Sequence, residues 1–166
     1  IIMPVFQTPD DLFNAYYDDF YYYFVIVRNF VAGHGSSFNG EVLTNGYHPL
    51  WAVLLTIPQV IAKFGSWDAL QITRLFITFI CGWGSLIISR FIFARAGSTP
   101  VGLTLGYTAF AVCFYLHISK SGMEVALTVP LFLLLLNQVK LEQETPQVNW
   151  ALIGFLGSLT ILSRID

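Results

Sequence analysis

Two adjacent carboxylates, Asp18 and Asp19, stand at the head of an aromatic and aliphatic run in the segment YYDDFYYYFVIVRN, residues 16–29. One of them could cap the helix that this run predicts, and the positive end of the helix dipole would favour both. A cap needs only one carboxylate, however. Two side by side can also supply a general base, or oxygen ligands for a divalent cation such as Mg²⁺ or Mn²⁺. The pair therefore has a structural and a chemical interpretation.

A third carboxylate, Glu124, stands in the segment SKSGMEVAL, directly before a long apolar run. Its structural interpretation is again an acidic group near a helix N-terminus, after a turn at Ser121 and Gly122. An ionisable group that enters a membrane helix is costly, however, and by default indicates a functional site. We therefore predict Asp18, Asp19 and Glu124 as catalytic residues, with Asp18 and Glu124 as the alternative pair of metal ligands.

Substrate-binding candidates come from two further motifs. His48, in NGYHPLW, precedes a proline and so lies in extended or turn backbone, where a lone histidine is more often a hydrogen-bonded loop residue than a ligand. Arg164 and Asp166, in LSRID, are either a pair at the membrane boundary or part of a phosphate site, because a guanidinium group offers paired donors. Lys120 supplies a further cation near Glu124. We predict these four residues as substrate-binding.

The composition is typical of a membrane protein. Of the 166 residues, 55% are hydrophobic and only 11% are charged, whereas about a quarter of the residues in a soluble domain are charged. The formal charge of −2 argues against nucleic acid as a partner, because a phosphate-binding surface needs a basic excess. The two cysteines, Cys81 and Cys113, lie inside apolar runs and in no metal-binding or redox spacing.

Long uncharged runs predict the membrane-spanning elements. A span needs about 20 residues, and the shorter runs reach that length once their flanks and snorkelling basic side chains are counted. We predict four spanning helices in one domain that covers the whole chain, at about residues 70–93, 99–119, 124–139 and 148–163.

A fifth apolar segment, Pro49 to Phe64, contains Pro58, Gln59 and Lys63. Its length and polar content favour a helix that lies in the membrane interface over one that crosses it. Residues 7–69 then form one outer loop, which begins with an interfacial helix from Asp18 to Gly33. We interpret Trp51, Trp67 and Trp150 as interface anchors and Trp83 as a core residue.

This placement decides which residues share a side of the membrane. Arg90 and Arg95 follow the first predicted span, as expected of a cytoplasmic turn under the positive-inside rule. The acidic residues Asp18, Asp19 and Glu124 then lie on the outer side together with Arg164 and Asp166. If Pro49 to Phe64 crossed the membrane instead, Glu124 would face away from the aspartate pair.

The ordered motifs resemble a known family. An aspartate pair followed by a helix and GHG, then FNGEVLTNGYHPLW, SGMEVAL and LSRID, is similar to the integral-membrane glycosyltransferases of the GT-C fold. These enzymes use polyprenyl-phosphate sugars and include mannosyl-, aminoarabinose- and arabinofuranosyltransferases, of which the chain most resembles the bacterial arabinofuranosyltransferase-like members. The resemblance implies an all-α membrane bundle in a bacterial plasma membrane, with interfacial helices in the first outer loop and an active site that faces outward. It assigns a base or a metal ligand to Asp18 or Asp19, and a second acidic role to Glu124.

The function that the resemblance implies is transfer of a sugar from a polyprenyl-phosphate donor to a hydroxyl of a glycan, lipid or protein acceptor of the cell envelope. Asp19 or Asp18 accepts the proton of the attacking hydroxyl, and a cation or a bound metal meets the leaving lipid phosphate. The rival is a transporter or flippase subunit in which Glu124 and Asp19 relay protons. We also expect the chain to be an internal fragment of a longer protein that lacks the first helix and the later helices, and to be inactive alone.

Overall fold

The computed structural model describes residues 18–96, 104, 108, 121–144 and 149–164. Within these residues every regular element is a helix, and the only β-type pairing is an isolated bridge between Ser37 and Leu43. The helices are α2 (Asp18–Ala32), α3 (Pro49–Gly65), α4 (Ala69–Ala96), α6 (Val125–Glu144) and α7 (Trp150–Ser163). The expected all-α class is thus confirmed for the described residues.

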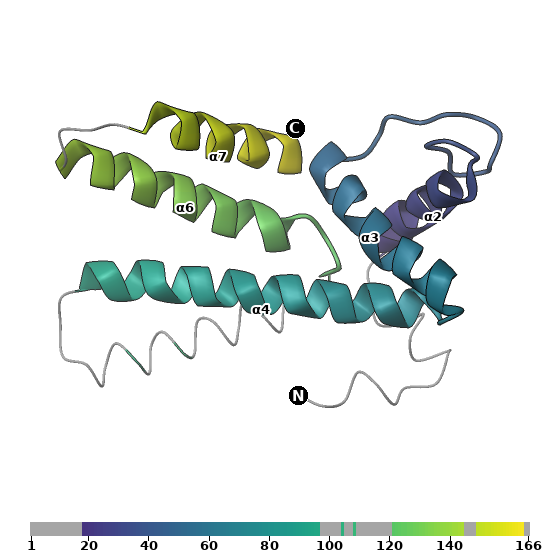
Figure 1. Cartoon of the computed structure of the whole chain (residues 1–166), viewed down its shortest axis with the longest axis horizontal. Helices are drawn as coiled ribbons and strands as arrows, with labels where there is room; N and C mark the ends of the chain where they lie inside the picture. The colour runs from purple at the N-terminus through teal and green to yellow at the C-terminus, as the bar shows by residue number, and fades with distance from the viewer. Residues whose placement is uncertain (1–17, 97–103, 105–107, 109–120, 145–148, 165–166) are drawn as a thin grey trace.

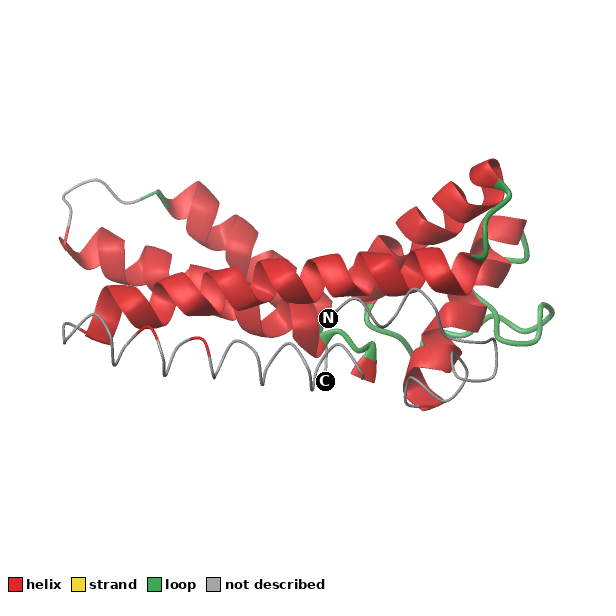
Figure 2. Ribbon diagram, turned by 90° about the horizontal axis from the view of Figure 1, so that it is seen from below, coloured by secondary structure: helices red, strands yellow, loops and turns green. Residues whose placement is uncertain are grey.

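The helices form two groups that meet near the middle of the molecule. Helices α4, α6 and α7 are stacked with roughly parallel axes, and the chain runs through α7 in the direction opposite to α6. Helices α2 and α3 cross at one end of α4 (Figure 1). Helix α3 joins the groups, because it packs on α2, on α4 and on α7. Seen at right angles, the long loop between α2 and α3 extends from the same end of α4 (Figure 2).

Helix α2 ends where the sequence predicts. Gly33 takes a φ of +94°, which a residue without a Cβ atom adopts at little cost. The N–H groups of Gly33 and His34 donate to the carbonyls of Phe30 and Asn29, at 3.1 and 2.9 Å, and so satisfy the last turn. The Asn29 side chain then donates to the carbonyls of Ser37 and Phe38 and fixes the start of the loop.

Helix α3 is apolar on two faces. One face is buried against the other helices by Trp51, Leu55 and Ala62, while the opposite face exposes a stripe of large apolar side chains. The exposed stripe consists of Val53, Ile57, Ile61 and Phe64. The exposed side chains form an apolar surface that is larger than scattered exposed residues would give.

Two of the four tryptophan predictions are wrong. Trp67 and Trp150 are 61% and 73% exposed, and their role as interface anchors stays a prediction. Trp51 is fully buried in the core, because its position on α3 turns its ring toward α2 and α4. Trp83, which we predicted as core, is 36% exposed because it projects from the uncovered side of α4.

One described helix is long and apolar enough to cross a membrane, namely the segment Ala69–Ile92 of α4. Its 24 residues span about 36 Å at 1.5 Å per residue, which exceeds a hydrocarbon core of about 30 Å. It begins at Asp68, whose Oδ1 atom accepts from the Gln71 N–H at 2.8 Å as an N-cap does. The apolar parts of α6 and α7 are shorter, Val125–Val139 and Trp150–Ser163. The predicted span 99–119 lies outside the described residues apart from 104 and 108.

The core occupies the junction of the two helix groups. It is built from every described helix except α7, whose Leu159 packs against its edge. A buried hydrogen bond from Gln59 Nε2 to Thr73 Oγ1, 3.3 Å, ties α3 to α4 beside it. The largest fully buried side chains of the core are Phe20, Trp51, Leu55 and Ile77.

Candidate functional site

Glu124 lies in the turn that leads into α6, and only 3% of the residue is exposed. Gly122, with a φ of +64°, shapes this turn. The Glu124 backbone carbonyl accepts from the Thr128 N–H at 2.9 Å and from the Thr128 hydroxyl at 3.1 Å. The side chain does not cap the helix, because the N–H groups of Ala126 and Leu127 donate to backbone carbonyls. The structural interpretation of Glu124, an acidic group near a helix N-terminus, agrees with its position directly before the first residue of α6, where the helix dipole favours a carboxylate.

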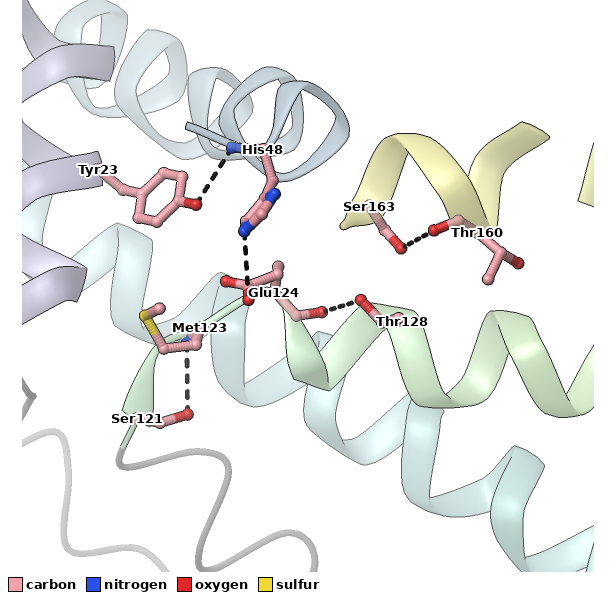
Figure 3. Close-up of polar contacts among 8 residues, drawn as sticks. All are labelled: Tyr23, His48, Ser121, Met123, Glu124, Thr128, Thr160 and Ser163. Atoms are coloured by element: carbon pink, nitrogen blue, oxygen red, sulfur yellow. Dashed lines mark hydrogen bonds and ion pairs between the residues drawn. The ribbon is translucent and has the colours of Figure 1, made fainter. Parts of the chain in front are cut away.

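The Glu124 carboxylate faces His48. Its Oε1 atom lies 3.7 Å from His48 Nε2, a separation that is attractive when the imidazole is protonated (Figure 3). Glu124 is covered, while 20% of the His48 side chain is exposed, so the imidazole separates the carboxylate from the surroundings. Two predicted site residues that are far apart in the sequence thus form one pair.

Tyr23 of α2 supports His48 from the other side. The two rings are stacked, with centroids 6.4 Å apart and an interplanar angle of 25°. The backbone N–H of His48 also donates to the Tyr23 hydroxyl at 3.2 Å (Figure 3). His48 itself has the extended backbone that Pro49 imposes, with φ −79° and ψ 118°. Three segments, from α2, α3 and the turn before α6, therefore converge on one imidazole.

The site contains two buried polar atoms that lack a hydrogen-bond partner among the described residues. They are Oε2 of Glu124 and Nε1 of Trp51. Trp51 follows His48 by three residues, so both side chains leave the same face of α3. An unsatisfied buried polar group costs about 1–3 kcal/mol and calls for an explanation, of which a functional role is one.

Helix α7 ends beside this pair. Ser163 is fully buried and its hydroxyl donates to the Thr160 carbonyl at 2.7 Å (Figure 3). The predicted phosphate ligand Arg164 follows directly, is exposed, and has its backbone N–H bonded to the Ile161 carbonyl. Asp166 and Lys120, the other two predicted substrate-binding residues, lie outside the described residues.

The aspartate pair begins the helix that carries Tyr23. Asp18 and Asp19 are exposed in the first turn of α2, where the dipole favours them. Asp19 precedes Tyr23 by four residues, so the two lie on one face with Cβ atoms about 6 Å apart. Tyr23 in turn contacts His48. The Asp19 carboxylate is thus one helical turn from the residue that supports the pair.

The metal hypothesis gains no support from the geometry. Across the described parts of the chain, no three side chains of His, Cys, Asp or Glu come together as a metal site would require. Asp18 and Glu124 were the predicted ligands, yet Asp18 is exposed and Glu124 is buried against His48. Metal binding by this pair stays a prediction.

Sequence reasoning missed three residues of the site: Tyr23, Trp51 and Ser163. Tyr23 had a signal, because it follows Asp19 at the helical spacing of four. Trp51 and Ser163 had none, since only the packing of α3 and α7 shows that they point inward.

No protein-family model, curated protein or solved structure matches the chain.

Proposed function

We propose that the chain belongs to a membrane glycosyltransferase that moves a sugar from a polyprenyl-phosphate donor to an acceptor hydroxyl. The observation that carries this proposal is the buried Glu124 carboxylate, which faces His48. His48 in turn contacts Tyr23 of α2, the helix that begins with the aspartate pair. The residue is almost fully covered, and within the described residues its Oε2 atom has no hydrogen-bond partner. An ionisable group that enters a membrane helix is by default a candidate functional residue. The order of the sequence motifs, which resembles that of the GT-C enzymes, supports the same reaction.

The proposed reaction is a single displacement. The acceptor oxygen attacks the anomeric carbon, its proton passes to Asp19 or Asp18, and the bond from that carbon to the lipid phosphate breaks. An exposed carboxylate suits this role because the acceptor must approach from the aqueous side. A single displacement inverts the anomeric configuration.

In the proposed reaction, His48 and Glu124 bind the lipid-phosphate sugar donor. The leaving phosphate gains negative charge, and an imidazolium held against Glu124 can stabilise it. The second carboxylate oxygen, Oε2, is an acceptor for a hydroxyl of the sugar. Arg164, exposed at the end of α7, is the further cation of the proposal.

The arrangement of the helices supports a site at the membrane surface. Helix α4 has the length of a span, and α3 crosses it at an angle instead of running beside it (Figure 1). The exposed apolar stripe of α3 would then rest in the interface. A lipid-linked donor is reached from such a position, because its phosphate lies at the level of the headgroups.

The rival function, a proton-coupled transporter, gains less support. A relay needs ionisable groups along a path through the membrane. The apolar stretches 75–89 of α4 and 125–139 of α6 contain no Asp, Glu, His, Lys or Arg. The candidate carboxylates lie instead at helix starts, in the first turn of α2 and in the turn before α6.

Transfer assays on the full-length protein test the proposal. Membranes that contain the protein are supplied with a polyprenyl-phosphate pentose and, in parallel, a polyprenyl-phosphate hexose. Loss of a general base typically lowers the rate by about 10²–10⁴-fold, so we expect a loss in that range for Asp19→Asn or for Asp18→Asn. We expect a clear loss for Glu124→Gln as well. Glu41→Gln, which alters an exposed loop carboxylate, is the matched control.

Three results would count against the proposal in different ways. Full activity of the Glu124→Gln variant would remove the role of the buried carboxylate. A product with retained configuration would exclude the single displacement. Proton uptake into proteoliposomes that depends on Glu124, without sugar transfer, would favour the transporter.

A further inference from the structure

A separate cavity of about 240 Å³ lies at the other end of α3. Its walls include Arg28 of α2, Lys63 of α3 and Trp67, which precedes α4. Lys63 follows His48 by fifteen residues of helix, or roughly 22 Å at 1.5 Å per residue. This cavity is therefore distinct from the Glu124 site.

Two cations from different helices face this cavity. Lys63 Nζ donates to the Val31 carbonyl at 3.2 Å, which holds the ammonium group at the wall and leaves its other donors available. Arg28 is exposed and lines the same space. Among the described lining residues there is no acid. The nearest carboxylate in the sequence, Asp68, is turned to the Gln71 N–H instead.

Apart from Gln59, the remaining lining is apolar, and two exposed aromatic residues, Phe64 and Trp67, follow Lys63 in the sequence. Val31 and Ala62 line the cavity beside the cations, and Trp67 is 61% exposed at its edge. Phe64, which follows Lys63, is 86% exposed. Basic residues next to tryptophan and other apolar side chains are typical of the level at which lipid headgroups lie.

We propose that this cavity binds the phosphate group of an anionic membrane lipid, with Arg28 and Lys63 as its ligands. The two cations bind the phosphate, and the rings of Trp67 and Phe64 contact the adjoining apolar part of the same lipid. A free phosphate ion would use the cations alone and would leave these two rings in water. The proposal does not rest on sugar transfer, because it concerns a different part of the molecule.

Native mass spectrometry of the full-length protein in detergent tests this site. The protein is titrated with phosphatidylglycerol and, separately, with phosphatidylcholine. We expect tighter binding of phosphatidylglycerol, which Arg28→Gln and Lys63→Gln should each weaken about fivefold and the double variant about thirtyfold. Lys63→Arg should keep the affinity. The control is Arg90→Gln, which removes an exposed cation near the other end of α4 and should leave binding unchanged.

Four results would overturn the proposal. They are equal affinities for the two lipids, an unchanged affinity in the double variant, an equal loss in Arg90→Gln, and displacement of phosphatidylglycerol by inorganic phosphate at comparable concentration. The last would assign the cavity to a free ion. Because Arg28 is exposed and forms no hydrogen bond or ion pair within the described residues, Arg28→Gln remains informative even if a Lys63 variant does not fold. None of these measurements depends on whether the protein transfers a sugar.

Discussion

Replacing Glu124 by methionine should stabilise the protein while it removes the proposed function. The carboxylate is 3% exposed, and its Oε2 atom finds no donor within the described residues. Burial of such an atom costs about 1–3 kcal/mol. The opposing term is the attraction to His48, which is 3.7 Å away and 20% exposed. Solvent screening limits that attraction to about 1 kcal/mol or less, so the net gain is about 1 kcal/mol.

Thermal unfolding of the full-length protein in detergent, followed by tryptophan fluorescence, measures this gain. A change of 1 kcal/mol shifts the melting temperature of a domain of this size by about 2–4 °C. Methionine suits the test because its unbranched chain has nearly the length of glutamate and adapts to irregular space. Glu124→Gln keeps a polar head and should therefore gain less. Glu41→Gln alters an exposed loop and should not move the melting temperature.

A fall of the melting temperature in both Glu124 variants would refute the reasoning. It would mean that the carboxylate holds the turn before α6 together, as one partner of a structural ion pair. Removing one partner of a buried pair is destabilising by about 3–5 kcal/mol. The His48→Asn variant would then show a comparable loss, and the observation that carries the proposed function would have a purely structural cause.

Three further substitutions test the fold by melting temperature. Leu55→Ala should lower the free energy of unfolding by about 2–5 kcal/mol, because Leu55 is only 1% exposed. Val53→Ala, on the exposed stripe of α3, should change the stability little in detergent. Equal effects of the two substitutions would contradict the packing of α3. Gly33→Ala should destabilise the protein by about 1 kcal/mol because Gly33 has a positive φ, although no atom lies within 4 Å of the added Cβ. Gly82→Ala is equally uncrowded but lies inside α4, so it should stabilise the protein by a similar amount. A change of the same sign in both variants would contradict the backbone conformation assigned to these residues. Gln59→Met should cost about 1 kcal/mol by removing the hydrogen bond to α4, and an unchanged melting temperature would mean that this bond is not formed.

The helices were largely predictable because their signals are local. Pro49 after an extended residue and Gly33 after an apolar run mark boundaries that the structure reproduces. The prediction fell short for α6, which continues to Glu144 beyond the predicted end at 139. Hydropathy reports where a helix can face lipid, whereas charged residues such as those after Val139 still form helix readily.

The site was predictable as single residues and not as an arrangement. Glu124 and His48 each stood out by type and position, but their pairing depends on how α3 packs against the start of α6. Trp51 shows the same limit of sequence-based prediction. An aromatic residue near a membrane interface can be an anchor if it lies on the outer face of its helix, or a core residue if it lies on the inner face, and Trp51 is buried. Asp18 and Asp19 were expected on the same side of the membrane as Glu124, and this stays a prediction. The structure shows only that Asp19 lies one helical turn before Tyr23, which contacts His48.

The way in which His48 is held has a consequence for function. The residue stands at the first turn of α3, and that helix is fixed by a buried core on one face and by the Gln59 hydrogen bond further along. Its partners Tyr23 and Glu124 likewise belong to α2 and to the entry of α6. A site whose groups sit on packed helices is held more precisely than one built on a loop. Leu55→Ala leaves a cavity two turns from His48, which should let the imidazole move relative to Tyr23 and Glu124. We therefore expect this variant to lose more transfer activity than the decrease in its folded fraction accounts for.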